Sequence, residues 1–258
     1  MKFNKQLTDK LEEIITTGLR KKMQSYQPET KYMPFHHRLL GKDRMALFSF
    51  IHSLNTTFGT SIFEPVAETL AGSFFETAQK QYVVGNSITE QAQYEIQNII
   101  NSLSMGKSSP DQTTETEIIR QVCKKGRVIK IKTVKADLFL IDKKGTAHMI
   151  DIKTAKPNIS QFKDFKRTLL EWIAVYLFNN PDANITSYLA IPYNPYYPKP
   201  YERWTLKGMI DPCKELKVEE EFWDFLGGEG AFLQILDCFE RAGIQLREEI
   251  DRYFSNFK

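Results

Sequence analysis

The sequence contains few cysteines, and Cys123, Cys213 and Cys238 are scattered and odd in number. They form neither a disulfide framework nor a zinc-binding pattern, so a reducing cytoplasm is the expected compartment. No apolar run approaches the length of a membrane span. The N-terminal residues MKFNKQLTDKLEEII carry acids and lack an apolar signal core. We therefore expect neither a membrane protein nor a disulfide-stabilised secreted module.

A strong charge imbalance is also missing, since the net charge is only +3. This value is too small to identify a nucleic-acid binder, so the distribution of charge matters more. The chain has 258 residues, of which 41% are hydrophobic and 26% charged, and it shows no internal repeat. These values are ordinary for a globular protein with one sizeable core.

Periodicity predicts an α/β fold in which a mixed β-sheet is flanked by helices. Residues 1–117 are expected to be mainly helical, and residues 118–258 to form a strand-rich core within the same compact unit. Polar residues 104–116 are expected to be the loop between these parts. The expected helices are 8–26, 43–55, 61–80, 87–103, 160–178 and 230–254, and the expected strands are 127–132, 134–142, 146–153 and 185–191.

A β-hairpin is predicted where two β-rich runs, VKADLFLID and TAHMIDIK, flank Lys143-Lys144-Gly145. Such a three-residue loop suits Gly145 in the left-handed conformation. Pairing Asp142 with Thr146 makes the numbers of opposed residues sum to 288, which sets Asp137 across from Asp151. Opposed Cβ atoms lie about 4.5–5.5 Å apart. Two carboxylates there would repel by roughly 3 kcal/mol at an effective dielectric near 20.

A hard divalent cation between the two acids would offset that repulsion. We expect Asp137, Asp151 and the Ile152 carbonyl to hold magnesium. Lys153 projects from the same strand face as Asp151, where it would orient or deprotonate the attacking water or stabilise the phosphorane charge. Together these groups predict phosphodiester hydrolysis. The plainer alternative is a surface hairpin with incidental charges, but the apolar residues after Asp137 argue for burial.

Two details qualify this prediction. The same register sets Lys135 opposite Lys153, which requires sheet twist, a bulge or a role for Lys135 on DNA. Upstream, Pro110-Asp111 supplies a literal proline–aspartate pair, but it falls in the polar loop without a strand signal. We therefore reject Asp111 as a ligand.

Glu64 and Glu68 in SIFEPVAETLA lie one turn apart on one expected helix, and either could offer a further carboxylate to the metal site. Two acids on a helix are usually solvated. Glu64, at the expected helix start between Phe63 and Pro65, is the preferred candidate for a fourth catalytic group.

Basic residues flank the proposed site on both sides, with seven between Arg120 and Lys135 and no acid among them. A charge run is often a solvated face, but two runs beside one metal site favour phosphate binding. His36, His37 and Arg38 are interpreted as surface or structural residues, and the aromatic run 192–204 as a loop packed on the domain. The expected DNA contacts are Lys130, Lys132, Lys135, Lys156, Asn158, Lys163, Lys166 and Arg167.

The residues Asp137 and Asp151-Ile152-Lys153 resemble the metal and catalytic positions of the PD-(D/E)xK nuclease superfamily. Ala136 stands where the superfamily's literal proline would be. Over roughly residues 60–258, the blocks KADLFLID, IDIKTAKPN, QFKDFKRTLLEW and EFWDFLGGEG resemble the TdeIII group of type II restriction endonucleases.

This resemblance implies a restriction-endonuclease-like core in a magnesium-dependent homodimer, with manganese able to substitute. Such an enzyme cuts both strands of double-stranded DNA at a short palindrome, GGNCC for this group, and leaves 5′-phosphates. It also implies a prokaryotic cytoplasm and a functional pairing with a DNA methyltransferase. The alternatives are a structure-specific repair or mobile-element nuclease and an inactive nuclease-like DNA-binding module.

Overall fold

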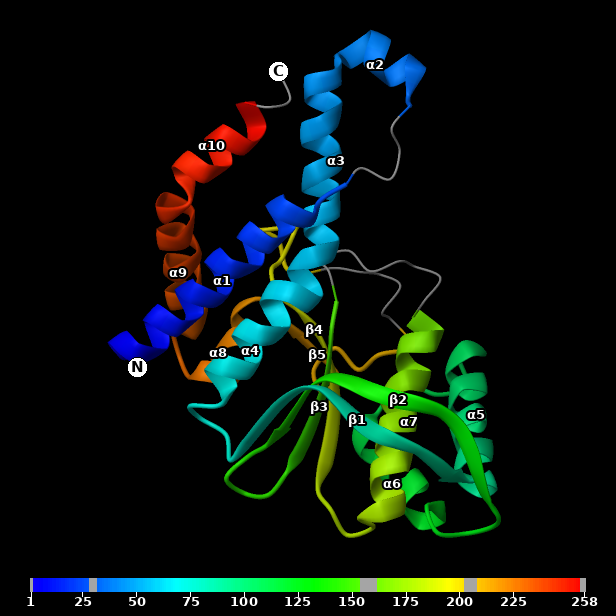
Figure 1. Cartoon of the computed structure of the whole chain (residues 1–258). Helices are drawn as coiled ribbons and strands as arrows, with labels where there is room; N and C mark the ends of the chain where they lie inside the picture. Colours follow the sequence, from blue (N-terminus) through cyan, green and yellow to red (C-terminus); the bar gives the residue numbers. More distant parts are fainter. Residues whose placement is uncertain (1, 28–31, 154–161, 202–207, 256–258) are drawn as a thin grey trace.

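A five-stranded sheet in the order β1-β2-β3-β4-β5 forms the centre of the protein (Figure 1). The strands are β1 (Thr77–Thr89), β2 (Val128–Ile141), β3 (Ala147–Ile152), β4 (Ile185–Ile191) and β5 (Leu216–Val218). The computed structural model describes residues 2–27, 32–153, 162–201 and 208–255. Strands β1 to β3 pair antiparallel, whereas β4 pairs in parallel with both β3 and β5. The predicted mixed sheet flanked by helices is confirmed.

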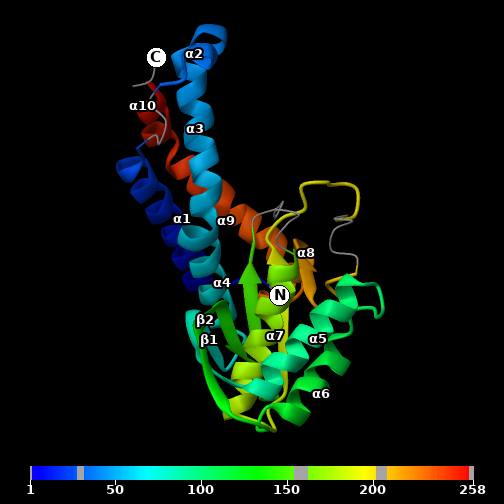
Figure 2. The same cartoon turned by 90° about the vertical axis from the view of Figure 1, so that its right-hand side faces the viewer.

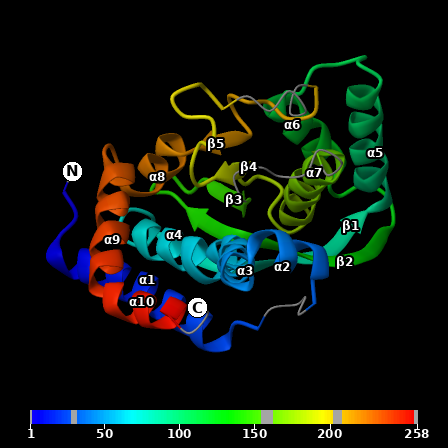
Figure 3. The ribbon, with the colours of Figure 1, turned by 90° about the horizontal axis from the view of Figure 1, so that it is seen from above.

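Helices cover both faces of this sheet (Figure 3). Helices α5, α6 and α7 contribute to one hydrophobic core, and α1, α4, α8 and α9 contribute to the other. The helical elements are α1 (Lys5–Ser25), α2 (Pro34–Leu40), α3 (Lys42–Thr57), the π-helix η1 (Phe58–Phe63), α4 (Glu64–Ala71), α5 (Glu90–Ser104), α6 (Gln112–Val122), α7 (Phe162–Asn179), α8 (Glu220–Gly227), α9 (Ala231–Gln245) and α10 (Arg247–Ser255).

The composition of the central strands explains their position. Every residue of β3 is buried, and six of the seven residues of β4 are buried. Such continuous burial is typical of strands that are covered on both faces. Between them, the apolar side of α7 packs on the sheet, so the β3-α7-β4 segment is a parallel crossover.

Strand β1 is the main difference from the predicted secondary structure. The helix predicted at 61–80 ends at Ala71, and Thr77 begins a strand that pairs with β2 over most of its length. Residues before and after position 118 therefore share one sheet. The polar loop predicted at 104–116 likewise contains the start of α6, where the Asp111 carboxylate accepts a hydrogen bond from Thr113 N as the N-cap. This capping role agrees with the rejection of Asp111 as a ligand.

Helices α2 and α3 project away from the sheet (Figures 1 and 2). Helix α3 buries Met45 and Phe50, and Phe50 contacts the rings of Tyr253 and Phe254 from α10. The chain continues from α3 through η1 into α4, and Glu64 is the first residue of α4. No helix in the described ranges is long and apolar enough to cross a membrane.

Candidate active site

The hairpin between β2 and β3 has the predicted register. Its pairs run from Ile141–Ala147 to Leu138–Ile150, and the numbers of each pair sum to 288. Gly145 has a φ of +79°, and Asp142 Oδ1 accepts hydrogen bonds from the backbone of Lys144 and Thr146. The next positions on the two strands are Asp137 and Asp151, just beyond the last pair.

The two aspartates lie in different surroundings. Asp151 is only 6% exposed, whereas Asp137 is half-buried and its Oδ2 accepts a hydrogen bond of 2.9 Å from Ile152 N. The pKa of Asp151 is raised to about 7, chiefly because burial disfavours its charged form. The ammonium of Lys153 opposes this rise, and the Asp137 carboxylate adds to it. The two carboxylates are therefore close enough to repel each other.

Lys153 is held beside Asp151 at the end of β3. Its Nζ lies 2.7 Å from Asp151 Oδ1 and 5.1 Å from the centre of the Phe165 ring. Its backbone N donates to the Ala190 carbonyl at 2.9 Å, which extends the pairing of β3 with β4. The side chain remains 31% exposed, so the ammonium faces both the carboxylate and solvent.

Of the two acids on α4, Glu64 is the one placed next to the aspartates. It is 3% exposed, and its pKa is raised to about 7, chiefly by burial and further by Asp137, while a hydrogen bond from Gln81 lowers it. Glu68 instead anchors β1, because its Oε1 accepts from Lys80 N at 2.9 Å and its Oε2 pairs with Lys80 Nζ at 3.3 Å.

Sequence analysis missed Gln81, which links these acids. Its Nε2 donates to Glu64 Oε2 at 2.8 Å and lies 3.4 Å from Asp137 Oδ1. The helix predicted over 61–80 overlaps the start of β1, so no strand was predicted around Gln81. The aromatic and β-branched run Tyr82, Val83 and Val84 is the signal that would have favoured a strand.

Comparison with known proteins places the chain in a family. The family model of the HinfI type II restriction endonucleases matches residues 3–243. The chain belongs to the HinfI family of type II restriction endonucleases. These enzymes are site-specific deoxyribonucleases, and the resemblance to type II restriction endonucleases is confirmed, although the matched family is HinfI rather than the TdeIII group.

Curated relatives carry the same description. The type II restriction enzyme MjaII of Methanocaldococcus jannaschii is 28% identical over 80% of this chain, which spans 58% of the length of MjaII. The type II restriction enzymes HgiCII and HgiEI of Herpetosiphon aurantiacus are each 24% identical, over 85% and 84% of this chain and 80% and 79% of their own length.

The donor set fits the hard divalent cation that restriction enzymes of this kind generally use. Glu64, Asp137 and Asp151 supply carboxylate oxygens, the ligand type that Mg²⁺ prefers. Each carboxylate already receives a hydrogen bond or an ion pair from Gln81, Ile152 N or Lys153, so nitrogen donors compensate part of the charge. Within the described ranges no three His, Cys, Asp or Glu side chains converge as a ready-made metal cluster.

One predicted DNA contact is wrong. Lys166 is fully buried in α7, where Nζ donates to both carboxylate oxygens of Glu215, at 2.6 and 2.8 Å, and pairs with Glu115. A side chain enclosed by two acids cannot reach a phosphate. Lys163 and Arg167 on the same helix are not enclosed in this way.

The remaining predicted DNA contacts differ in exposure. Lys130, Lys132 and Lys135 are exposed on β2, although Lys130 Nζ also donates to Asn86 and Ser87. On α7, Lys163 is exposed and half-buried Arg167 donates to Gln97 Oε1 at 2.6 Å. Lys156 and Asn158 lie outside the described residues.

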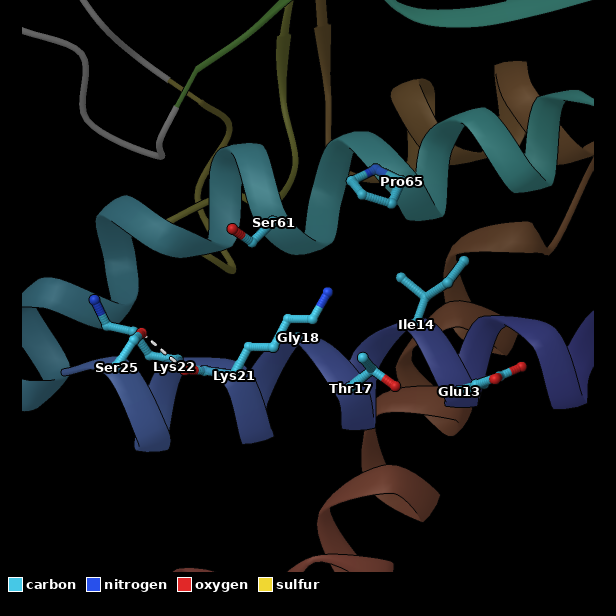
Figure 4. A pocket seen from close by; sticks show the side chains of 9 residues that line it. All are labelled: Glu13, Ile14, Thr17, Gly18, Lys21, Lys22, Ser25, Ser61 and Pro65. Carbon is cyan, nitrogen blue, oxygen red and sulfur yellow. Dashed lines mark hydrogen bonds between the residues drawn. The ribbon is translucent and has the colours of Figure 1, made fainter.

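A separate cavity of about 560 Å³ lies between α1 and the η1–α4 segment (Figure 4). Its lining includes Lys21 and Thr17 from α1 and Ser61 and Pro65 from the facing segment. The carboxylates of the candidate active site do not line it, although Pro65 follows Glu64 directly.

Proposed function

We propose that this chain is a Mg²⁺-dependent type II restriction endonuclease. It hydrolyses phosphodiester bonds in both strands of a short palindromic site in double-stranded DNA and leaves 5′-phosphates. The observation that carries the proposal is that Glu64, Asp137, Asp151 and Lys153 lie together where β3 ends, in a chain of the HinfI family.

In this proposal Glu64, Asp137, Asp151 and the carbonyl oxygen of Ile152 hold the magnesium ion. When bound, the ion supplies positive charge that favours ionised water and stabilises the oxygens of the reacting phosphate. Manganese has similar ligand preferences and should substitute. Burial raises the pKa of Glu64 and of Asp151 to about 7, and a bound cation would lower both values.

Lys153 is the positively charged side chain that the protein itself supplies to the site. Its ammonium holds Asp151 in place and faces solvent, so it can donate a hydrogen bond to the attacking water or to the phosphate oxygens. The water oxygen attacks phosphorus, and the bond between phosphorus and the 3′-oxygen breaks. One DNA fragment then ends in a 3′-hydroxyl and the other in a 5′-phosphate.

Digestion of plasmid DNA tests this function. Discrete bands with Mg²⁺, and no cleavage by Asp151→Asn, are expected, and GGNCC is the first site to test because the TdeIII resemblance implies it. Cleavage confined to branched or nicked DNA would instead indicate a repair or mobile-element nuclease. A shift of DNA without cleavage in any metal would indicate a binding module.

Calcium provides a second test of the metal mechanism. Its longer and looser coordination should support DNA binding with little hydrolysis, whereas Mg²⁺ and Mn²⁺ should support both. Binding is measured by gel shift and cleavage by single-turnover assay. Equal cleavage in the presence of a chelator would eliminate the metal mechanism.

The proposal includes a homodimer, because cleavage of both strands of a palindrome calls for two such sites related by twofold symmetry. Support comes from the unusual exposure of large apolar side chains on α2 and α3, with Phe35 at 83% and Phe48 at 63%. Sedimentation velocity should show a dimer that Phe48→Asp weakens. We also propose a cytoplasmic setting and a DNA methyltransferase encoded nearby, which would protect the host's own sites.

A further inference from the structure

Gln81 has an unusual backbone conformation at the edge of the candidate active site. Its neighbours pair as Lys80–Leu138 and Tyr82–Ala136, so Gln81 stands across from Asp137 on β2. Its φ is +51°, in the left-handed region that L-residues with long side chains rarely adopt. Such a conformation persists only when the surrounding structure holds it, and residues of this kind are common in functional sites.

Contacts from α4 hold this part of β1. Glu68 accepts a hydrogen bond from Lys80 N and forms an ion pair with the Lys80 ammonium, and Glu64 accepts a hydrogen bond from the Gln81 side chain. The helix that carries Glu64 therefore also fixes the strand segment that reaches back to it. The unusual φ of Gln81 points its amide between Glu64 and Asp137.

The chemistry of the amide suits this place. Both partners are carboxylate oxygens, at 2.8 and 3.4 Å, so the group that faces them is the NH₂ and not the carbonyl. One neutral group thus donates to two acids that otherwise repel each other. A lysine in the same position would cancel their negative charge and compete with a metal ion, whereas an amide leaves that charge available.

We propose that Gln81 is a positioning residue that keeps Glu64 and Asp137 close enough to share a divalent cation. The inference rests on the proposed function, since it assigns Gln81 to the same metal site. Groups that orient metal ligands in this way commonly contribute about 10-fold to 100-fold to metal affinity.

Two variants separate the side chain from the backbone. Gln81→Met keeps the length and the strained φ without donors, whereas Gln81→Gly removes the donors and accepts the positive φ without strain. Gln79→Met is the matched control, because Gln79 is an exposed glutamine two residues earlier on β1. Mn²⁺ binding is measured by calorimetry without DNA, and the Mg²⁺ dependence of cleavage by single-turnover assay.

Both Gln81 variants should raise the Mn²⁺ dissociation constant by about 10-fold or more. They should also raise the half-saturating Mg²⁺ concentration, while cleavage at saturating Mg²⁺ recovers. Gln79→Met should match the wild type, and the glycine variant should melt at a higher temperature than the methionine variant. If Gln81→Met does not fold, the glycine variant alone decides the outcome.

Wild-type Mn²⁺ affinity in both Gln81 variants, or tighter binding, would overturn the positioning role. A lower cleavage rate with unchanged metal affinity would overturn it too. A wild-type protein that neither binds Mn²⁺ nor cleaves DNA would refute the proposed function, and this inference with it. The first two results leave the proposed function intact, so the two failures are distinguishable.

Discussion

Two clusters of lysine and carboxylate lie next to α7, and they differ in how completely their charges are compensated. In the first cluster, Lys166 is fully buried and bonds Glu115 and both oxygens of Glu215. Glu215 Oε2 also accepts from Asp211 N at 2.8 Å. In the second cluster, Lys153 is 31% exposed and bonds one oxygen of Asp151.

The difference distinguishes a structural ion pair from a site that can react. Around Lys166 every charged group is enclosed, and the ion pairs tie α7 to α6 and to the segment before β5, although burial raises the pKa of Glu215. Around Lys153 the ammonium pairs with one of three carboxylates, and the pKa of two of them is raised to about 7. Negative charge beside a partly exposed ammonium is what a cation or a phosphate-bound metal can use.

Removing a carboxylate from the second cluster should have the largest effect on activity. Asp151→Asn keeps the shape of the side chain but removes a metal ligand, so cleavage should fall on the order of 10³-fold, similar to the loss of other charge-stabilising groups in active sites. Single-turnover cleavage measures this loss, and circular dichroism checks the fold. Cleavage at the wild-type rate would remove Asp151 from the site.

Removing the lysine from the first cluster should affect stability instead. Lys166→Ala leaves Glu115 and Glu215 buried without a cation, which should lower the free energy of unfolding by about 3–5 kcal/mol. Urea denaturation measures the change, and Lys163→Ala on the exposed side of the same helix is the control. A loss below about 1 kcal/mol would contradict the structural role of the cluster.

The register of the hairpin could be predicted because it depends on local features. A glycine turn and alternating side chains fix which residues of β2 and β3 oppose each other, so Asp137, Asp151 and Lys153 emerge together. Their placement needs no knowledge of distant contacts. Helix α7 and strand β4 were also predicted closely, since both have strong apolar patterns.

The burial of Lys166 and the role of Gln81 could not be predicted in the same way. Lys166 falls among the core positions of α7, but only Glu115 and Glu215, distant in sequence, make its burial tolerable. Strand β1 is polar and lies at the sheet edge, so its residues carry little hydrophobic signal. In both cases the decisive partners come from other elements of the fold.

The second cluster should also make the stability of the protein depend on pH. Glu64 has a folded-state pKa of about 7 and an ordinary value of 4.5, so the folded protein binds the extra proton. Stability without metal should be greatest below about pH 4.5, as far as Glu64 contributes, and fall as pH rises to 7. The fall should be at most about 3 kcal/mol.

Urea denaturation in a chelator, between pH 5 and 8, tests this contribution. Glu64→Gln should be less sensitive to pH than the wild type, while Glu240→Gln on the exposed side of α9 should behave like the wild type. Saturating Mg²⁺ should also remove the effect, because the ion favours the charged carboxylate. If the free energy of unfolding changes equally with pH in the wild type and in Glu64→Gln, the pKa of Glu64 is not raised.

The smallest effects are expected for the exposed basic residues, which sharpen the contrast with buried Lys166. If Lys163 and Lys130 contact phosphates, each alanine variant should weaken binding to all DNA sequences alike. Each should also reduce the slope of log affinity against log salt by about 0.9. Binding is measured in Ca²⁺ across a salt series, on cognate and scrambled duplexes.

Lys217→Ala is the control, because the Lys217 ammonium stacks on Tyr188 and Phe225. An unchanged slope would show that a tested lysine is only solvated, and a loss confined to cognate DNA would show that it reads bases.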